Sequence, residues 1–248
     1  MHLDENRIRH IWRVDPDGGN PRQVTAGPGE NLADVSPDGK TVAFVTSSSP
    51  PALWAASANG GEPVKLVATF LAKGHLSFSP DGTRIAYLDL TELDGKPHNS
   101  WKVISSADGH PVGSGSLDAG LAHGFGFPDV EWTADGKALT FLDEVGGISN
   151  VYRQPLGGGK PQPVTRFTDG EIGDHEWSPD GRKLLLMRGD GRIENIWMTG
   201  ADGSHTVQLT DFRTGRIDSV DWLPPDGHRI VFTYGQQTSD VVLIKNFR

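Results

Sequence analysis

Glu176-Trp177-Ser178-Pro179-Asp180-Gly181-Arg182-Lys183-Leu184-Leu185-Leu186 is one copy of the pattern that decides the fold. Five copies occur, each with an acidic residue or Ser, an aromatic residue or Val, a Pro-Asp-Gly-like turn and an apolar strand. Their turn aspartates are Asp38, Asp81, Asp135, Asp180 and Asp226, which lie 43, 54, 45 and 46 residues apart. This spacing is typical of four-stranded propeller blades, which repeat every ~40–50 residues.

The chemistry of the turn predicts a tight hairpin. Pro presets φ for the first corner of a type I turn, Asp suits the second corner, and Gly takes the left-handed position that follows. Ala134 replaces Pro in the third copy, and a type I turn tolerates this change.

A second pattern lies between these hairpins. Ile11-Trp12-Arg13-Val14 leads to Gly18-Gly19 and then to the short strand Arg22-Gln23-Val24-Thr25. Each repeat is therefore predicted to hold four strands, A and B around Pro-Asp-Gly and C and D around the second turn. The aromatic or Val positions of strands A and C are expected to fill the space between blades: Val35, Phe78, Trp132, Trp177, Trp222, Trp12, Trp54, Trp101, Tyr152 and Trp197. Burying one such ring contributes roughly 1.5–3 kcal/mol.

These units predict one all-β domain over residues 1–248, a β-propeller of about six four-stranded blades with incomplete terminal blades. The N-terminus supplies strands C and D, with Met1–Glu5 as a remnant of strand B, and the C-terminus supplies A, B and C. A five-bladed ring that merges the two ends is the alternative, although strand C would then be supplied twice. We expect the chain to be a fragment of a longer protein, whose open terminal blades would permit oligomers.

The Ser-Pro-Asp-Gly-Lys/Arg hairpins, followed by an aromatic strand, Gly-Gly and Arg-Gln-Val-Thr, resemble the TolB-type, WD-like β-propeller repeat. The resemblance covers essentially the whole chain. It implies a bacterial protein in a periplasmic or other extracytoplasmic setting, acting as a sensor or scaffold region of a larger protein. No signal peptide is visible, because Met1–Glu5 is polar.

Composition narrows the classes of function. The formal net charge is −9 and no dense Lys/Arg run occurs, which disfavours nucleic acid as a partner. No apolar run is long enough to span a bilayer, so we expect no membrane insertion. Cys is absent, which excludes disulfides, thiol catalysis and Cys-ligated zinc. We expect no cofactor.

Variable loops predict the recognition face. The B–C and D–A connections are long and irregular, whereas the A–B and C–D turns are short and uniform. Binding residues concentrate on variable loops held by a rigid scaffold. The longest loop, from Pro111 to Pro128, is rich in Gly and carries His123, Phe125 and Phe127. Its Phe residues either contact a partner or fold back onto the core.

Acidic residues precede the strand-A aromatics in four of the five copies. They are Asp34, Glu131, Glu176 and Asp221, with Ser77 at the remaining position. Because strand A lines the central channel, these carboxylates either attract a cation or a basic segment, or bond to neighbouring blades and channel water. His75, Asp129 and Asp174 lie two residues further back, and His175 lies between Asp174 and Glu176.

No catalytic motif stands out. A Gly-x-Ser-x-Gly nucleophile motif, a phosphate-binding loop and a His-Glu-x-x-His metal motif are all absent. The sequence therefore favours a noncatalytic propeller that binds a protein, peptide or small ligand at the long-loop face and channel mouth. The alternative is a metal-dependent, lyase-like propeller acting on carbohydrate. Convergence of two or more of His75, His98, His123 and His175 on one point would favour that enzyme.

Overall fold

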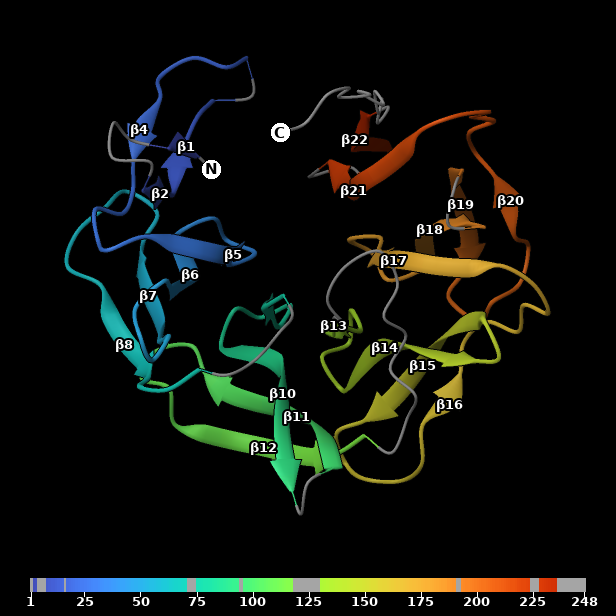
Figure 1. Ribbon diagram of the computed structural model, residues 1–248, viewed down its shortest axis with the longest axis horizontal. Coiled ribbons are helices and arrows are strands. Elements are labelled where there is room, and N and C mark those ends of the chain that lie inside the picture. The colour runs from blue at the N-terminus through green and yellow to red at the C-terminus, as the bar shows by residue number, and fades with distance from the viewer. Residues whose placement is uncertain are drawn as a thin grey trace, which may run out of the picture.

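The structure is a computed structural model that describes residues 2–3, 8–15, 17–70, 75–93, 96–117, 130–190, 193–223 and 228–235. Its elements are all β-strands, arranged as radial sheets around a centre (Figure 1). The described residues contain no helix long and apolar enough to cross a membrane.

Four sheets are complete blades of four antiparallel strands. Blade 1 contains β5 (Glu30–Val35), β6 (Thr41–Thr46), β7 (Leu53–Ser57) and β8 (Val64–Val67). Blade 2 contains β9 (Ser77–Phe78), β10 (Arg84–Leu93), β11 (Lys96–Ser105) and β12 (Pro111–Ser116). Blade 3 contains β13 (Val130–Trp132), β14 (Ala138–Val145), β15 (Ile148–Pro155) and β16 (Gln162–Pro163). Blade 4 contains β17 (Glu171–Trp177), β18 (Lys183–Gly189), β19 (Glu194–Gly200) and β20 (Val207–Gln208). Strands A to D follow this order in every blade, as the repeat predicts.

The end strands form three two-stranded sheets. β1 (His2–Leu3) pairs with β2 (Arg9–His10), and β3 (Trp12–Arg13) pairs with β4 (Arg22–Gln23). At the other end, β21 (Arg216–Leu223) pairs with β22 (Arg229–Gly235). β1 lies beside β2 in a two-stranded sheet of its own, and the expected remnant of strand B stays a prediction. The structure thus shows four complete blades and does not show six, because the described end residues lack an inner strand at the N-terminal end and strands C and D at the C-terminal end.

The Pro-Asp-Gly hairpins fold as their chemistry predicts. In blade 1 the Gly39 N–H donates to the Ser36 carbonyl at 2.8 Å, and φ of Gly39 is +69°. Asp38 Oδ1 accepts bonds from the Ser36 hydroxyl (2.7 Å) and the Lys40 N–H (3.0 Å). These side-chain bonds recur at Asp81, Asp135 and Asp180, including the copy that carries Ala134 instead of Pro.

The core lies between neighbouring sheets. One buried apolar cluster occupies each interface, from the β3–β4 side of blade 1 to the interface between blade 4 and the β21–β22 hairpin. Trp132 is buried, and its Nε1–H donates to the Ser77 carbonyl of blade 2 at 2.9 Å. Trp222 repeats this bond with the Glu176 carbonyl of blade 4 at 3.3 Å. The strand-A aromatics therefore fill the interfaces, as predicted.

Val35 and Trp12 depart from this expectation. Val35 is 50% exposed and Trp12 is 37% exposed. No inner strand is described for the sheets that precede β5, so nothing covers Val35 as blade 2 covers Trp132. Trp12 lies on β3, whose sheet has only two strands.

Candidate ligand site at the centre of the ring

The inner strands of the four blades and β21 carry the candidate site. These strands lie next to one another around the centre, β5 beside β9, β9 beside β13, β13 beside β17 and β17 beside β21. Successive side chains of a strand point to opposite faces. The residue before each interface position is therefore turned away from the blade interface and toward the central channel.

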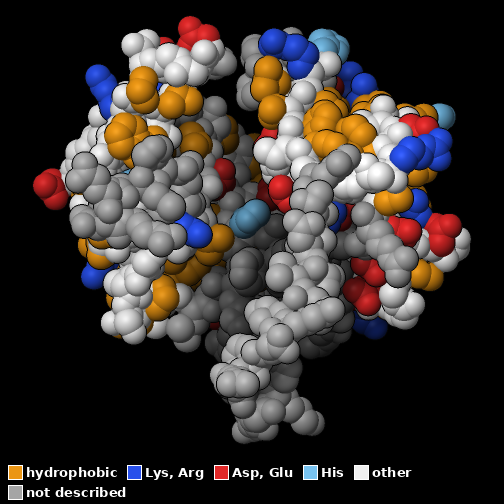
Figure 2. Space-filling model, turned by 45° about the horizontal axis from the view of Figure 1, so that its top comes forward, with side chains coloured by type: hydrophobic (Ala, Val, Ile, Leu, Met, Phe, Trp, Pro, Cys, Tyr) orange, Lys and Arg blue, Asp and Glu red, His pale blue; other side chains and the backbone are white. Residues whose placement is uncertain are grey.

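A cavity of about 540 Å³ occupies this position. Its polar lining consists of Asp34, His75, Ser77, Glu131, Glu176 and Asp221, and its apolar lining includes Leu32, Leu76 and Phe78. The space-filling view shows acidic side chains around a hollow, close to a histidine (Figure 2). All four predicted acidic positions thus meet in one cavity, although they come from sequence positions 34 to 221.

Two of the carboxylates join neighbouring blades. Asp34 Oδ2 accepts the Phe78 N–H of blade 2 at 2.9 Å, and its Oδ1 accepts the Val35 N–H at 2.7 Å. Glu131 Oε2 accepts the hydroxyl of Ser77, also from blade 2, at 2.8 Å. Asp34 and Glu131 therefore bond to a neighbouring blade, which was one of the two roles expected for these carboxylates.

The other two carboxylates have no hydrogen-bond partner within the part of the chain that the structure describes. Burial raises the pKa of Glu176 well above its ordinary value, and the charges of Glu131, Asp174, Asp221 and Asp34 raise it further. Partial loss of water also raises the pKa of Asp221, while His75 lowers it. Burial raises the pKa of Asp34 to about 6 against the lowering effect of its two backbone hydrogen bonds. The cavity therefore gathers four carboxyl groups, and His75 offsets the charge of Asp34 and Asp221 in part.

His175 does not belong to this cavity. It is 1% exposed and lies on the opposite face of β17 from Glu176, with Nε2 2.9 Å from Thr140 Oγ1 of blade 3. Burial lowers the pKa of His175 to about 4, so it is neutral near pH 7. Asp174 is half-buried and close enough to raise the pKa of Glu176, but it does not line the cavity. The expectation that His175 lies on the recognition face is therefore not met, because side chains alternate along the strand.

Several predicted residues lie outside the described part of the chain: His123, Phe125, Phe127 and Asp129, together with the side chain of His98. Among the described residues, His75 faces the cavity and His175 faces blade 3, so these two do not converge. No group of three His, Cys, Asp or Glu residues in the described ranges could hold a metal ion. Nothing in the described part of the chain favours a lyase.

Ser77 is the site residue that the sequence analysis left out of its candidates. It lines the cavity and fixes Glu131, but its type does not match the acidic residues at the other four positions. The repeat could have identified Ser77, because it precedes Phe78 as Glu131 precedes Trp132.

Together the radial sheets and inner-strand cavity define a β-propeller, and its fold is similar to that of TolB proteins, which confirms the predicted resemblance at the level of the fold. No protein-family model and no curated protein matches the chain. TolB from Acinetobacter baumannii is similar with a TM-score of 0.65 and 23% identity, over 81% of this chain and 48% of that one. A putative TolB from Agrobacterium tumefaciens has a TM-score of 0.64 and 19% identity, over 85% of this chain and 77% of that one. This chain thus spans about half the length of the Acinetobacter protein.

A protease also contains a similar domain. The β-propeller domain of the Trilobed protease from Pyrococcus furiosus, described as having an open velcro topology, has a TM-score of 0.63 and 13% identity. The likeness covers 92% of this chain and 71% of that one. At these identities the comparisons show a shared fold and leave the ligand open.

Proposed function

We propose that this chain is a noncatalytic binding module that takes up a cationic group of a protein, peptide or small ligand in the central cavity. The proposed contacts are Asp34, Glu131, Glu176 and Asp221, with His75 in the same lining and Asp174 close enough to act on Glu176. Asp129, His123, Phe125 and Phe127 lie outside the described residues and stay predicted contacts. The observation that carries the proposal is Glu176, a carboxylate without a described hydrogen-bond partner beside other carboxylates. A cation in the cavity would act against the burial and the neighbouring carboxyl charges that raise the pKa of Glu176.

Selection from a random peptide-display library tests this proposal. Glu176→Gln with Asp221→Asn removes two cavity charges, and neither side chain holds a blade through a described hydrogen bond. We expect peptides selected on the unmodified chain to be rich in Lys and Arg and to bind this double variant at least tenfold more weakly. Binding should also weaken with salt, because screening reduces electrostatic attraction.

The matched control is Glu144→Gln with Asp218→Asn, which removes the same charge at exposed positions outside the cavity. If the selected peptides bind both double variants equally well, the cavity is not the binding site.

A second candidate function is an accessory propeller of a peptidase, which the likeness to the Trilobed protease domain favours. The full gene product would then hydrolyse aminoacyl p-nitroanilides, whereas this chain alone would not. A gene product without such activity under conditions where a known aminopeptidase is active would count against this candidate.

We also propose that the strands occupy six blade positions in an extracytoplasmic bacterial protein, with β1–β4 in the first position and β21–β22 in the last. The strand order supports this: β1 to β4 correspond to B, C and D, and β21 and β22 to A and B. In a five-bladed ring, β22 would instead pair with β3. Because the chain has no cysteine, Trp12→Cys with Phe232→Cys would then form a disulfide under oxidation, and six positions predict none.

A further inference from the structure

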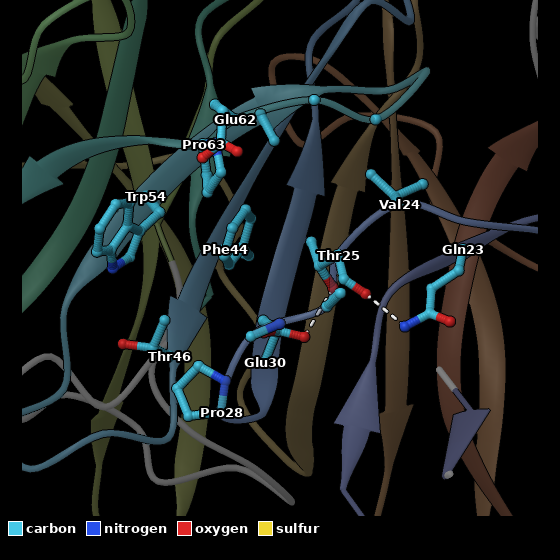
Figure 3. A pocket seen from close by; sticks show the side chains of 15 residues that line it. Gln23, Val24, Thr25, Pro28, Glu30, Phe44, Thr46, Trp54, Glu62 and Pro63 are labelled. Atoms are coloured by element: carbon cyan, nitrogen blue, oxygen red, sulfur yellow. Dashed lines mark hydrogen bonds between the residues drawn. The ribbon is translucent and has the colours of Figure 1, made fainter.

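A second cavity, which we name groove 1, lies between the β3–β4 sheet and blade 1, away from the central cavity. Its volume is about 510 Å³. It is lined by the segment Gln23–Pro28, by side chains of β6 and β7 and by the turn Gly60–Pro63 (Figure 3). None of its lining residues lines the central cavity.

The acidic end of groove 1 is built around Glu30, which is 1% exposed. Glu30 Oε2 accepts the Thr25 hydroxyl at 2.7 Å and lies 2.9 Å from His10 Nδ1, while Oε1 accepts the Gly27 N–H at 2.9 Å. Such donors hold the carboxylate in one position. Glu62, an exposed residue of the turn, adds a second carboxylate, and no Lys or Arg lines the groove.

The remaining wall of groove 1 is largely apolar. Phe44 and Trp54 come from adjacent strands, and Pro28 and Pro63 border the space (Figure 3). The Trp54 ring already contacts one cation, because Lys65 Nζ, which is not a lining residue, lies 4.8 Å from its centroid. Aromatic faces attract cations through the ring quadrupole, most strongly where water is excluded.

The repeat supplies an internal comparison, a cavity of about 470 Å³ between blades 2 and 3 that we name groove 2. Phe141 and Tyr152 take the places of Phe44 and Trp54, and both turns read Gly-Gly-x-Pro. The third turn residue, however, is Lys160 in groove 2 and Glu62 in groove 1. Two grooves of the same origin thus present opposite charges at their rims.

We infer that groove 1 is a binding site for an organic cation, an ammonium or guanidinium group carried on an apolar or aromatic body. The apolar body would pack against Trp54 and Phe44, and the cation would lie toward Glu62 and Glu30. Groove 2 offers a similar aromatic wall and also holds Asp143, but Lys160 stands where groove 1 has Glu62, so we expect groove 2 to bind the same ligand more weakly.

The experiment uses phenethylammonium as the probe, with uncharged 2-phenylethanol and anionic phenylacetate as comparators of similar shape. NMR titration reports binding through the indole N–H resonance of Trp54, assigned by its loss in Trp54→Phe. We expect phenethylammonium to bind at least tenfold more tightly than either comparator and to lose affinity as salt increases. The capped dipeptide acetyl-Phe-Lys-amide, added separately, tests whether a lysine side chain of a peptide also fits.

Three variants locate the charge that matters. Glu62→Lys gives groove 1 the rim of groove 2 and should weaken binding about tenfold, whereas Glu144→Lys, at an exposed position elsewhere, should not. Gly27→Ala should also weaken binding, because a Cβ on Gly27 would collide with Glu30 Oε1. The reciprocal Lys160→Glu should introduce binding that shifts the resonances of Tyr152.

The inference is overturned if 2-phenylethanol binds as tightly as phenethylammonium, or if Glu62→Lys leaves affinity unchanged in a chain that remains folded. Glu176→Gln with Asp221→Asn should not change binding at Trp54. A loss in that variant would assign the probe to the central cavity instead. Failure here would leave the proposed central site intact, since the two sites share no residue.

Discussion

The two faces of the inner strands differ in whether their buried polar groups have hydrogen-bond partners. On β17, Glu176 faces the cavity and has no described hydrogen-bond partner, whereas His175 and Trp177 both meet Thr140 Oγ1 of blade 3, at 2.9 and 3.0 Å. On β13, Glu131 lines the cavity while Trp132 is bonded into the interface with blade 2. Neighbouring residues of β17 therefore serve separate purposes, with hydrogen bonds to blade 3 on the interface face and a carboxyl group without a described partner on the cavity face.

Burial acts on both faces but in opposite senses. It raises the pKa of Glu176 and lowers the pKa of His175, because in each case it disfavours the charged form. Acid should therefore reduce the contribution of the interface face to the free energy of unfolding and remove the unfavourable charge on the cavity face.

Trp132→Ala should break the interface face most severely. We expect it to lower the free energy of unfolding by about 3–5 kcal/mol, because it leaves a cavity where a buried ring packed. Arg84, whose guanidinium lies 4.5 Å from the ring centroid, would lose its stacking partner as well. Urea denaturation measures the change. Glu131→Gln on the opposite face is the control, and a larger loss there than in Trp132→Ala would contradict the division of the two faces.

His175 should make the interface sensitive to acid. Its pKa is about 4 in the folded chain, against about 6.5 when unfolded. Its contribution is fully present above pH 6.5 and is lost as the pH falls toward 4, by up to about 3 kcal/mol. The difference in unfolding free energy between the unmodified chain and His175→Gln, measured from pH 7 to 4, isolates this effect. A difference that stays constant across this range would show that His175 does not titrate in this way.

The hairpin turns belong to neither face, and a substitution there should cause a loss of stability of intermediate size. Ser79 is buried, and its hydroxyl bonds to Asp81 Oδ1 and accepts the Arg84 N–H at 3.0 Å. Ser79→Ala should cost about 1 kcal/mol of stability. It should also raise the pKa of Asp81, which that hydroxyl chiefly holds at about 2. Carboxyl titration by NMR checks the second effect, and an unchanged Asp81 would refute the proposed cause.

Glu176→Gln should raise the free energy of unfolding, whereas the variants above lower it. Because the folded pKa of Glu176 is raised, its contribution is present at low pH and is lost as the pH increases. The variant should therefore be more stable than the unmodified chain at pH 8 and gain nothing at pH 4. Thermal unfolding at the two pH values measures this difference. Destabilisation at pH 8 would mean that the carboxylate has a structural partner.

The repeat made most of the fold predictable. Pro-Asp-Gly determines the turn, and the alternation along strand A places Asp34, Glu131, Glu176 and Asp221 on one side and Trp132 and Trp222 on the other. The same alternation could have placed His175 with the core, opposite Glu176. Val35 was expected to be buried because the repeat also predicts a preceding blade whose inner strand would cover it. No such inner strand is described.

Groove 1 could not be predicted from local pattern. Its lining comes from segments around Thr25, Phe44, Trp54 and Gly60, and its shape depends on how far apart two sheets stand. The comparison of Glu62 with Lys160 is readable in the sequence, but it gains meaning only once both turns are known to border a cavity.

Each apolar cluster draws its residues from two adjacent sheets and no others. Apolar packing among the described residues therefore couples each sheet to the sheet beside it, so cooperativity through the core is largely one-dimensional. Unfolding can then advance as a front from either end while the middle of the array still holds. Amide hydrogens of blades 2 and 3 should be the slowest to exchange, and an injury near β21 should leave the exchange of blade 1 almost untouched.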